Sequence, residues 1–399
     1  MSDPTPQGMA RRDFLKSAAV ATAGVTVVQA KSVKGSRANS KVELGIIGTG
    51  GRGVWFGKLC HKHADIQVVA LADPFDDRLK VGRDALKVDA SRCHKGLDGY
   101  KELLASKVDA VSVTSPPYYH PEQVMASIDA GKHVIVAKPV AVDVPGCNIV
   151  LEAGKKAEGK LSLLIDFQTR STPLFIEAAK RVHAGDIGKP VLGQVCYHGG
   201  RLSPRVDPKK RSDAARLRNW VFDIALSGDI IVEQNIHVLD VANWYLRSHP
   251  IKAYGTGGRK VRTDVGDCWD HFVVTYWYPN DVLVDFESTQ FAKGYSDLCT
   301  RLFGSNGTVD SHYFGHVSIK GDKPFKGGDT KGMFTDGTVA NIKALVESMR
   351  SAKPINNAKE SVDSNLTCIL GRIAAHENRT VTWDEMIKAN KRMVADLKL

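Results

Sequence analysis

The chain has 399 residues, with 43% hydrophobic and 25% charged side chains and a formal net charge of +11 at pH 7. These values are typical of a globular protein and exclude a low-complexity or intrinsically disordered chain. The length is sufficient for two domains with separate cores, and no apolar run approaches the roughly 20 residues that a transmembrane helix needs.

The first 30 residues have the pattern of a twin-arginine export signal. Residues 11–16 (RRDFLK) precede a short apolar stretch at residues 18–30, which ends in the small-residue cleavage site VQA. An apolar segment of this length behind two arginines is typical of a signal peptide and not of a membrane span. We therefore expect the twin-arginine machinery to export the protein to the periplasm, with residues 31–41 as a flexible lead-in.

From residue 42 onward, short apolar strands alternate with helical segments. We expect strands at 44–47, 67–72, 110–114, 133–137 and 161–165, and helices at 52–63, 76–86, 121–131 and 145–156. Continuous apolar strands between helices are typical of a parallel sheet that is covered on both faces. The sequence thus predicts a doubly wound α/β domain over residues 42–166, with its topological switch point beside a glycine-rich loop.

After residue 166 the pattern changes to longer, alternating strands. We expect helices at 172–184 and 230–246, strands at 191–197, 272–278 and 282–286, a further turn at 304–307, and helices from 337 onward with a break at 353–354. Residues 279–281 (PND) between two alternating strands predict a hairpin. The second domain, residues 167–385, is therefore expected to be α+β with a mostly antiparallel sheet and helices on one face, followed by a C-terminal helix at 386–399.

Neither the charge nor the cysteines indicate a nucleic-acid or metal site. Positive charge is densest between Arg201 and Arg218, where a solvated loop is the commoner interpretation and attraction to an anionic glycan is the alternative. The stretch lacks the interleaved aromatic residues of a nucleic-acid-binding surface. The seven cysteines have no close pairs, which excludes a zinc ribbon or a redox Cys-x-x-Cys site.

The glycine-rich loop follows the first strand and opens the first helix. It comprises Gly48, Thr49, Gly50, Gly51, Arg52 and Gly53. In a dinucleotide-binding loop of this form, Gly48 permits the tight turn, Gly50 allows the pyrophosphate to approach, and Gly53 lets the helix pack on the strand. The helix N-terminus would supply N–H donors and positive potential to the phosphates.

An acidic residue at the end of the second strand indicates which dinucleotide is bound. Asp73 lies 20 positions beyond Gly53, and its carboxylate can accept both hydroxyls of the adenosine ribose. It would repel a 2′-phosphate, so NAD is favoured over NADP. Arg78 lies nearby and keeps NADP as the less favoured alternative.

A lysine directly follows the fourth strand. The carboxyl ends of these strands border the ligand crevice, so Lys138 could lie over the nicotinamide and exchange a proton there. A lysine at a strand end is also common on protein surfaces, and the motif alone does not decide between the two.

Several motifs together resemble one enzyme family. They are the glycine loop, Ala72-Asp73, Ser115-Pro116 with His120, Lys138-Pro139, and a distant helix bearing His237. Their order is similar to that of the glucose–fructose oxidoreductase / inositol dehydrogenase / rhizopine catabolism (Gfo/Idh/MocA) family. The likeness covers nearly all of residues 42–385, including GDIG at 185–188, GSNG at 304–307 and VTWDE at 381–385.

The resemblance implies roles for these residues. Ser115, Pro116, His120 and Lys138 would contact the cofactor together with the glycine loop. The family's usual motif is Glu-Lys-Pro, and here Ala137 replaces the glutamate.

In the distant helix, glutamate replaces the family's aspartate four residues before the histidine. Glu233 and His237 would share one helix face. His237 would act as general acid/base on a sugar hydroxyl with help from Lys138, and Glu233 would orient His237 or bind a neighbouring hydroxyl. Glu233 and His237 could also be metal ligands, but no third ligand lies at a diagnostic spacing in the sequence. We therefore expect no metal.

Sugar rings favour aromatic stacking and bidentate polar contacts. Four residues fit such contacts, although core or surface roles are equally compatible: Gln168, Arg170, Tyr197 and Trp220.

Together these features predict an exported NAD-dependent oxidoreductase that acts on a sugar or glycoside hydroxyl. Because free dinucleotide is scarce outside the cytoplasm, the cofactor would be held tightly and recycled within each turnover, by a second sugar or by an external electron acceptor. The alternatives are an NAD-dependent glycoside hydrolase, which oxidises C3 transiently and eliminates the anomeric substituent, and a non-catalytic binding protein. By resemblance to the family's oligomers, the open sheet face would form a homodimer or homotetramer.

Overall fold

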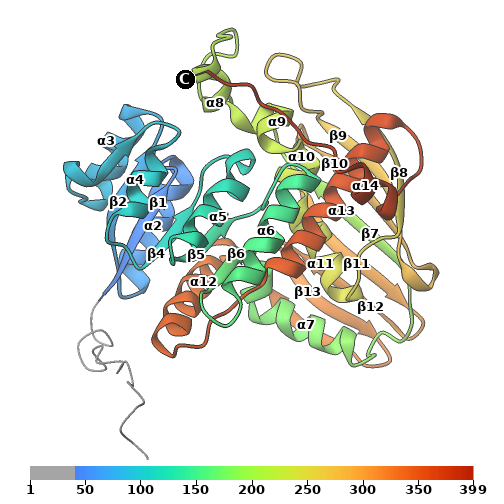
Figure 1. Cartoon of the computed structure of the whole chain (residues 1–399). Helices are drawn as coiled ribbons and strands as arrows, with labels where there is room; N and C mark the ends of the chain where they lie inside the picture. The colour runs from blue at the N-terminus through green and yellow to red at the C-terminus, as the bar shows by residue number, and fades with distance from the viewer. Residues whose placement is uncertain (1–40, 399) are drawn as a thin grey trace, which may run out of the picture. The chain divides into compact units, whose positions relative to one another are not determined.

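The structure is a computed structural model that describes residues 41–398, so the expected export signal and most of the lead-in lie outside the described residues. A parallel sheet with its helices comes first along the chain, and a larger mixed sheet follows (Figure 1). No helix within residues 41–398 combines the length and the apolar character needed to cross a membrane.

The first sheet has six strands in the order β3-β2-β1-β4-β5-β6, and all neighbouring pairs are parallel. The strands are β1 (Val42–Ile47), β2 (Ile66–Asp73), β3 (Cys93–Lys95), β4 (Ala110–Val113), β5 (His133–Ala137) and β6 (Leu163–Asp166). The strand order reverses at β1, directly before the glycine loop. The predicted doubly wound sheet and its switch point are therefore confirmed, whereas the short strand β3 was missed.

Helices cover both faces of this sheet. They are α2 (Gly51–His63), α3 (Asp76–Leu86), α4 (Gly99–Ala105), α5 (His120–Asp129) and α6 (Val144–Ala157). Helices α2 and α3 pack on one face, and α4, α5 and α6 pack on the other. The side chain of Asp143 caps α6 by accepting a hydrogen bond from the N–H of Gly146 (2.8 Å).

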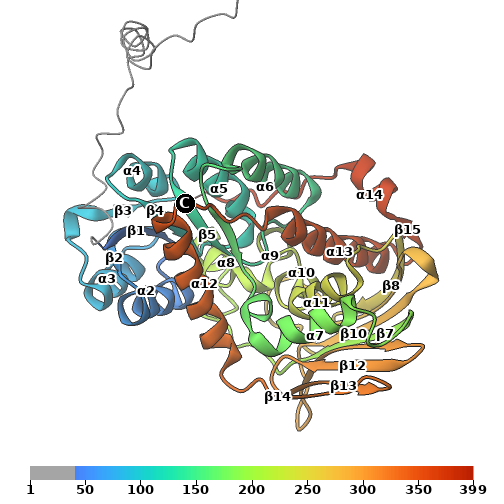
Figure 2. The same ribbon diagram turned by 90° about the horizontal axis from the view of Figure 1, so that it is seen from below.

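A helix from the C-terminal part of the chain returns to the first sheet. In α12 (Met333–Arg350), the buried side chains of Ile342, Leu345 and Val346 belong to the same apolar cluster as Leu44 and Phe56. Figure 2 shows α12 beside α2. Helix α12 therefore packs on the face of the first sheet that α2 and α3 cover, although the sequence assigned it to the second domain.

The second sheet has nine strands in the order β14-β13-β12-β11-β7-β10-β9-β8-β15. They are β7 (Pro190–His198), β8 (Lys252–Gly258), β9 (His271–Trp277), β10 (Leu283–Thr289), β11 (Asp297–Gly304), β12 (Gly307–His312), β13 (His316–Gly321), β14 (Phe325–Asp329) and β15 (Val381–Thr382). The β7–β10 pair is parallel and the other pairs are antiparallel. The predicted hairpin between β9 and β10 is confirmed.

Three helices cover one face of the second sheet: α7 (Pro173–His183), α11 (Ile236–Leu246) and α13 (Ala358–Glu377). Figure 2 shows them on the same side of the strands. On the opposite face, Leu192, Leu283 and Phe303 are neighbours across three strands and are 37–43% exposed.

Two helices expected from the sequence differ in the structure. The helix expected at 230–246 is divided into α10 (Ile230–Glu233) and α11, because the N–H of Asn235 bonds to the carbonyl of Ile230 (3.0 Å), five residues back. The expected C-terminal helix at 386–399 is wrong: α14 (Trp383–Ala389) ends at Asn390, which has φ of 43°. Beyond it, the N–H of Met393 bonds to Asp143 (2.7 Å), so the chain leaves the helical path.

Candidate active site

The glycine loop has the backbone geometry that a dinucleotide requires. Gly48 has φ of +90°, and a Cβ there would lie 2.7 Å from the backbone at Thr114 and Ser115. A Cβ on Gly53 would lie 2.0 Å from the carbonyl oxygen of Gly48. At Gly51, by contrast, a Cβ would meet nothing within 4 Å. The loop is therefore tight where α2 approaches the sheet and open where a phosphate would approach.

A cavity of about 760 Å³ lies over this loop. Among its lining residues are nine that the sequence assigned to the cofactor: Gly48, Thr49, Gly50, Gly51, Arg52, Asp73, Arg78, Ser115 and Pro116. The volume is within the range of small-molecule and cofactor sites. The residues present therefore fit an extended dinucleotide with its pyrophosphate at the N-terminus of α2.

Asp73 is 3% exposed and fixed by two backbone donors. Its carboxylate accepts hydrogen bonds from the N–H of Thr49 (2.8 Å) and the N–H of Phe75 (3.0 Å). Burial raises the pKa of Asp73, and these hydrogen bonds and the nearby charge of Arg78 oppose that rise. A carboxylate has about four acceptor sites, so the side chain can still accept ribose hydroxyls.

Part of the basic stretch 201–218 belongs to the cofactor cavity. Arg205 and Arg218 line it from the second domain. The guanidinium of Arg218 donates two hydrogen bonds to Asp77 (2.9 and 2.6 Å) and lies 3.9 Å from the ring centroid of Phe75. Trp220 also lines this cavity, so the structure places it beside the cofactor loop.

A lysine and a glutamate from distant parts of the chain are in direct contact. Lys138, at the end of β5, donates a hydrogen bond to the backbone carbonyl of Glu233, and its Nζ lies 3.3 Å from the carboxylate Oε1 of Glu233. The two side chains are only 15% and 14% exposed. In this environment the attraction between the two charges is stronger than it would be in water. Burial and the carboxylate of Glu233 both raise the pKa of Tyr197, which places this predicted sugar contact near the pair.

His237 lies in the first turn of α11 and is 7% exposed. Its ring packs against those of Phe167 (centroids 6.4 Å apart) and Tyr313 (4.8 Å). Burial, and then the positive charges of Lys138 and Arg52, hold the pKa of His237 well below 6.5. The imidazole is therefore neutral at pH 7 and able to accept a proton.

Glu233 and His237 do not share one continuous helix, because the chain breaks between α10 and α11. The structure nevertheless places both near Lys138, Glu233 by direct contact and His237 closely enough for the ammonium charge to lower its pKa. Among the described residues, the only grouping of three potential metal ligands is Asp297, Cys299 and His312, which includes neither of them.

Asp166, which was not predicted as a site residue, connects Arg52 of the cofactor loop to Asn341 on α12. It ends β6, is 2% exposed and forms an ion pair with Arg52. The amide Nδ2 of Asn341 donates to its other oxygen (2.8 Å). Lys138 was identified from its position at the end of a strand. Asp166 has the same kind of position in the sequence and could have been identified in the same way.

Three assignments from the sequence are corrected by the hydrogen bonds of the side chains. Gln168 is 1% exposed; its amide donates to Asp166 (3.1 Å) and accepts from Tyr313 (2.9 Å), so it supports the site from behind. Nε and Nη2 of Arg170 donate to the buried carboxylate of Asp240 through bonds of 2.8 to 3.2 Å, so an ion pair within the protein holds this side chain.

The third correction concerns His120, which was assigned to the cofactor. It is 1% exposed, and its ring nitrogens lie 2.7 Å from the carbonyl oxygens of Pro139 and Ser115. Burial lowers its pKa to about 4. His120 therefore connects the loop that carries Lys138 to the turn that lines the cavity, without lining it.

Comparison with known proteins agrees with this geometry. Residues 42–164 match the profile described as "Oxidoreductase family, NAD-binding Rossmann fold", and residues 175–310 match the "GFO/IDH/MocA C-terminal domain". The chain belongs to the GFO/IDH/MocA oxidoreductase family. The glycine loop and most of the cavity lining belong to the matched NAD-binding domain.

Relatives and solved structures extend over most of the chain. The myo-inositol 2-dehydrogenase of Thermotoga maritima is 25% identical over 357 residues, 87% of this chain and 100% of that protein. The inositol 2-dehydrogenase of Pseudomonas fluorescens is 26% identical over 78% of this chain and 87% of its own length. The scyllo-inositol dehydrogenase of Lactobacillus casei, solved with NAD(H) and scyllo-inositol, has 17% identity and a TM-score of 0.69, covering 86% of this chain and 100% of that one. The last likeness concerns the fold alone.

Proposed function

We propose that this protein oxidises a secondary hydroxyl of a cyclic polyol or sugar, with His237 as the base. The observation that carries the proposal is the contact of Lys138 with Glu233 near a buried, neutral His237. Burial, and then the charges of Lys138 and Arg52, lower the pKa of His237, and Arg52 lines the cofactor cavity. Bound NAD supplies the hydride acceptor at such a site. The relatives named as inositol 2-dehydrogenases support a cyclic polyol as the first substrate to test.

The chain's own residues divide the work on the hydroxyl. The hydroxyl proton must leave as the carbinol hydrogen is transferred, and the low pKa of His237 keeps the imidazole free to take that proton. The ammonium of Lys138 can donate to the oxygen on which negative charge develops. Glu233 holds that ammonium in place and remains able to accept a hydrogen bond from a neighbouring hydroxyl.

A polyol and sugar panel tests the proposal. Purified protein is first heat-denatured to see whether NAD is released, and intact protein is then mixed with myo-inositol, scyllo-inositol and common aldoses. We expect the absorbance of reduced nicotinamide to appear with at least one cyclic polyol or sugar. Bound NAD with no redox change across the panel, with and without added NAD and an electron acceptor, would instead favour a non-catalytic binding protein.

The same experiment distinguishes how the cofactor is reset. Paired lactone and alditol products without added NAD would indicate hydride transfer between two sugars. Release of the aglycone from a glycoside panel would indicate the NAD-dependent glycosidase. A steady rate only with an added electron acceptor would indicate external reoxidation.

We further propose export by the twin-arginine route, on the basis of the RRDFLK pattern at residues 11–16. Replacing Arg11 and Arg12 by lysine should keep the protein in the cytoplasm, whereas the parent sequence should be found in the periplasmic fraction. Equal distribution of the two proteins would contradict export by this route.

The open face of the second sheet is the proposed self-association surface. Its row of exposed apolar side chains at Phe303, Leu192 and Leu283 is the kind of surface that pairs with a second copy. Light scattering should show a dimer or tetramer that Leu192→Asp dissociates. A monomeric parent protein would contradict this surface.

A further inference from the structure

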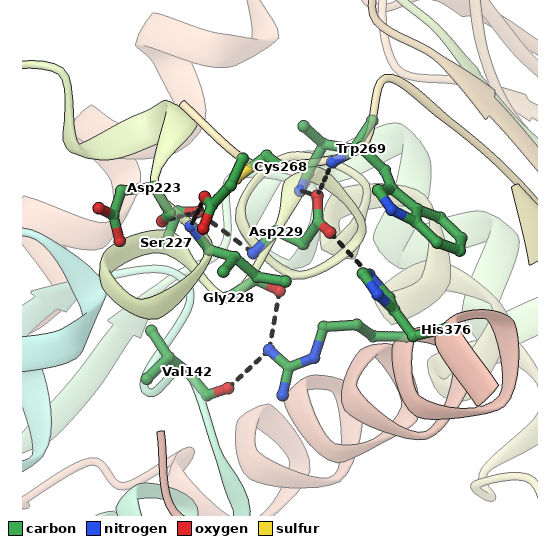
Figure 3. A network of polar contacts seen from close by, with 12 residues as sticks. Val142, Asp223, Ser227, Gly228, Asp229, Cys268, Trp269 and His376 are labelled. Atoms are coloured by element: carbon green, nitrogen blue, oxygen red, sulfur yellow. Dashed lines mark hydrogen bonds and ion pairs between the residues drawn. The ribbon is translucent and has the colours of Figure 1, made fainter. Parts of the chain in front are cut away.

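One buried arginine binds both the loop that follows Lys138 and the turn that precedes α10, the helix of Glu233. Arg372 lies on α13 and is 7% exposed. Its Nη1 donates hydrogen bonds to the carbonyl oxygens of Val142 and Gly228, both at 2.8 Å. Val142 follows Lys138 by four residues, and Gly228 precedes Glu233 by five. In Figure 3, dashed lines end on the carbonyl groups of Val142 and Gly228, among the other contacts of the network.

The turn that follows Gly228 is held in an unusual backbone conformation. Asp229 has φ of +76° and ψ of 166°, a region that non-glycine residues rarely adopt. Its carboxylate Oδ1 accepts from the N–H of Ile230 (2.8 Å) and the N–H of Trp269 (3.0 Å), and Oδ2 lies 3.0 Å from Nε2 of His376. Figure 3 shows Asp229 between Trp269 and His376. This network fixes the direction in which α10 leaves the turn.

The loop after Lys138 is anchored to the same helix at a second point. Asn365, seven residues before Arg372 on α13, accepts a hydrogen bond from the N–H of Val140 (2.9 Å) and donates to the carbonyl of Ala141 (3.1 Å). Helix α13 thus binds both the loop after Lys138 and the turn at Gly228. None of its residues lines the cofactor cavity.

An arginine suits this place better than a lysine. Both carbonyl groups are bound through one nitrogen of a planar guanidinium, whose N–H directions are fixed relative to one another. A lysine ammonium on a flexible stem carries the same charge without this fixed geometry. The carboxylates of Asp229 and Asp143 are the acidic charges that act on the buried guanidinium.

We propose that Arg372 is a positioning residue, which sets the place of the Lys138 ammonium relative to Glu233 and His237. The inference rests on the proposed function of that pair. Without the guanidinium, the two loops lose their shared partner and can shift independently. Because the charge of Lys138 helps to hold the pKa of His237 low, a shift of the ammonium changes the titration of His237.

The titration of His237 is the direct test. Isotope-labelled histidine in the NAD-loaded protein is followed by NMR across pH, with His237→Gln to assign the signal. We expect Arg372→Met to raise the pKa of His237 and Arg372→Lys to give an intermediate value. Arg379, which is 47% exposed beyond the end of α13, provides the control Arg379→Met, for which no change is expected. This measurement needs no substrate, so it is independent of whether the proposed reaction occurs.

Steady-state kinetics add a second readout. In Arg372→Met we expect kcat to fall by about 10²-fold, the effect typical of a small misplacement of a catalytic group, with unchanged NAD content and a smaller change in KM. Arg372→Lys should recover part of the rate. If Arg372→Met does not fold, the His237 titration and the kinetics are measured on Arg372→Lys alone.

An unchanged pKa of His237 in a folded Arg372 variant would overturn the inference, even if the variant were less heat-stable, because a merely structural role predicts only the loss of stability. Absence of turnover in the parent protein with a normal shift of the His237 pKa would instead reject the proposed function and keep the positioning role.

Discussion

The Nζ of Lys138 lies 3.3 Å from Oε1 of Glu233, although 95 positions separate the two residues in the chain. Lys138 directly follows strand β5 of the first sheet, and Glu233 ends the short helix α10 of the second domain. The contact therefore exists only when both parts of the fold are assembled. This contact is what makes Lys138, in an otherwise common Lys-Pro dipeptide, a candidate for proton transfer.

Removing the ammonium should stop hydride transfer without emptying the NAD site. For Lys138→Ala we expect kcat to fall by about 10²- to 10⁴-fold, the usual contribution of a positioned acid or base. NAD released on heating should be unchanged, because Lys138 does not line the cavity. Lys160→Ala, at an exposed lysine, is the control. A Lys138→Ala enzyme with the parent rate would remove Lys138 from the mechanism.

The acid limb of the pH–rate profile should depend on Arg52. Burial, Lys138 and Arg52 hold the pKa of His237 well below 6.5, so kcat/KM should stay level as pH falls through 6.5 and decrease only when the imidazole is protonated. Arg52→Gln removes one positive charge, raises the pKa of His237 and moves the acid limb to higher pH. Lys62→Gln, at an exposed lysine on the same helix that does not line the cavity, should leave the limb in place. Equal profiles for the two variants would contradict the electrostatic argument.

Two glycines of the cofactor loop should respond oppositely to one added methyl group. In Gly53→Ala, the new Cβ would lie 2.0 Å from the carbonyl oxygen of Gly48 and 2.8 Å from Oγ1 of Thr114. Relieving this overlap moves α2, and we expect a loss of about 1–3 kcal/mol in unfolding free energy together with weaker NAD binding. Gly51→Ala meets nothing within 4 Å and should retain the parent stability. Denaturant unfolding and NAD titration of both variants check the contrast.

The buried His120 should make the protein less stable in acid. Its pKa is lowered from 6.5 to about 4, so the unfolded chain takes up this proton first as pH falls. The stabilisation from neutral His120 is complete above pH 6.5 and is lost as pH falls from 6.5 to 4. The glutamine in His120→Gln does not titrate. Denaturant unfolding should therefore show that the parent protein's advantage in unfolding free energy over this variant becomes smaller as pH falls from 6.5 to 4.

Local patterns in the sequence were sufficient for five of the six strands of the first sheet and for the glycine loop. Apolar runs gave the positions of β1, β2, β4, β5 and β6, since a strand buried on both faces has a continuous apolar signature. The three glycine roles also follow from local sterics, and the close approaches at Gly48 and Gly53 agree with them.

The parts that could not be predicted depend on distant contacts. The break before Asn235 separates two segments that both read as helical, and it leaves Glu233 and His237 on successive helices. Arg170 carries the same side chain whether it binds a sugar or a carboxylate, and only the fold brings Asp240 to it. For the same reason, nothing near Arg372 in the sequence indicates that it binds Val142 and Gly228.

The return of α12 to the first sheet limits how this enzyme can be recombined with its relatives. A recombinant fragment that ended at Asp166 would expose to water the apolar surface that Ile342, Leu345 and Val346 occupy. Such a fragment should aggregate unless the α12 sequence is appended to it. Chimaeras that exchange the nucleotide-binding half between family members would need to transfer this helix from the same parent.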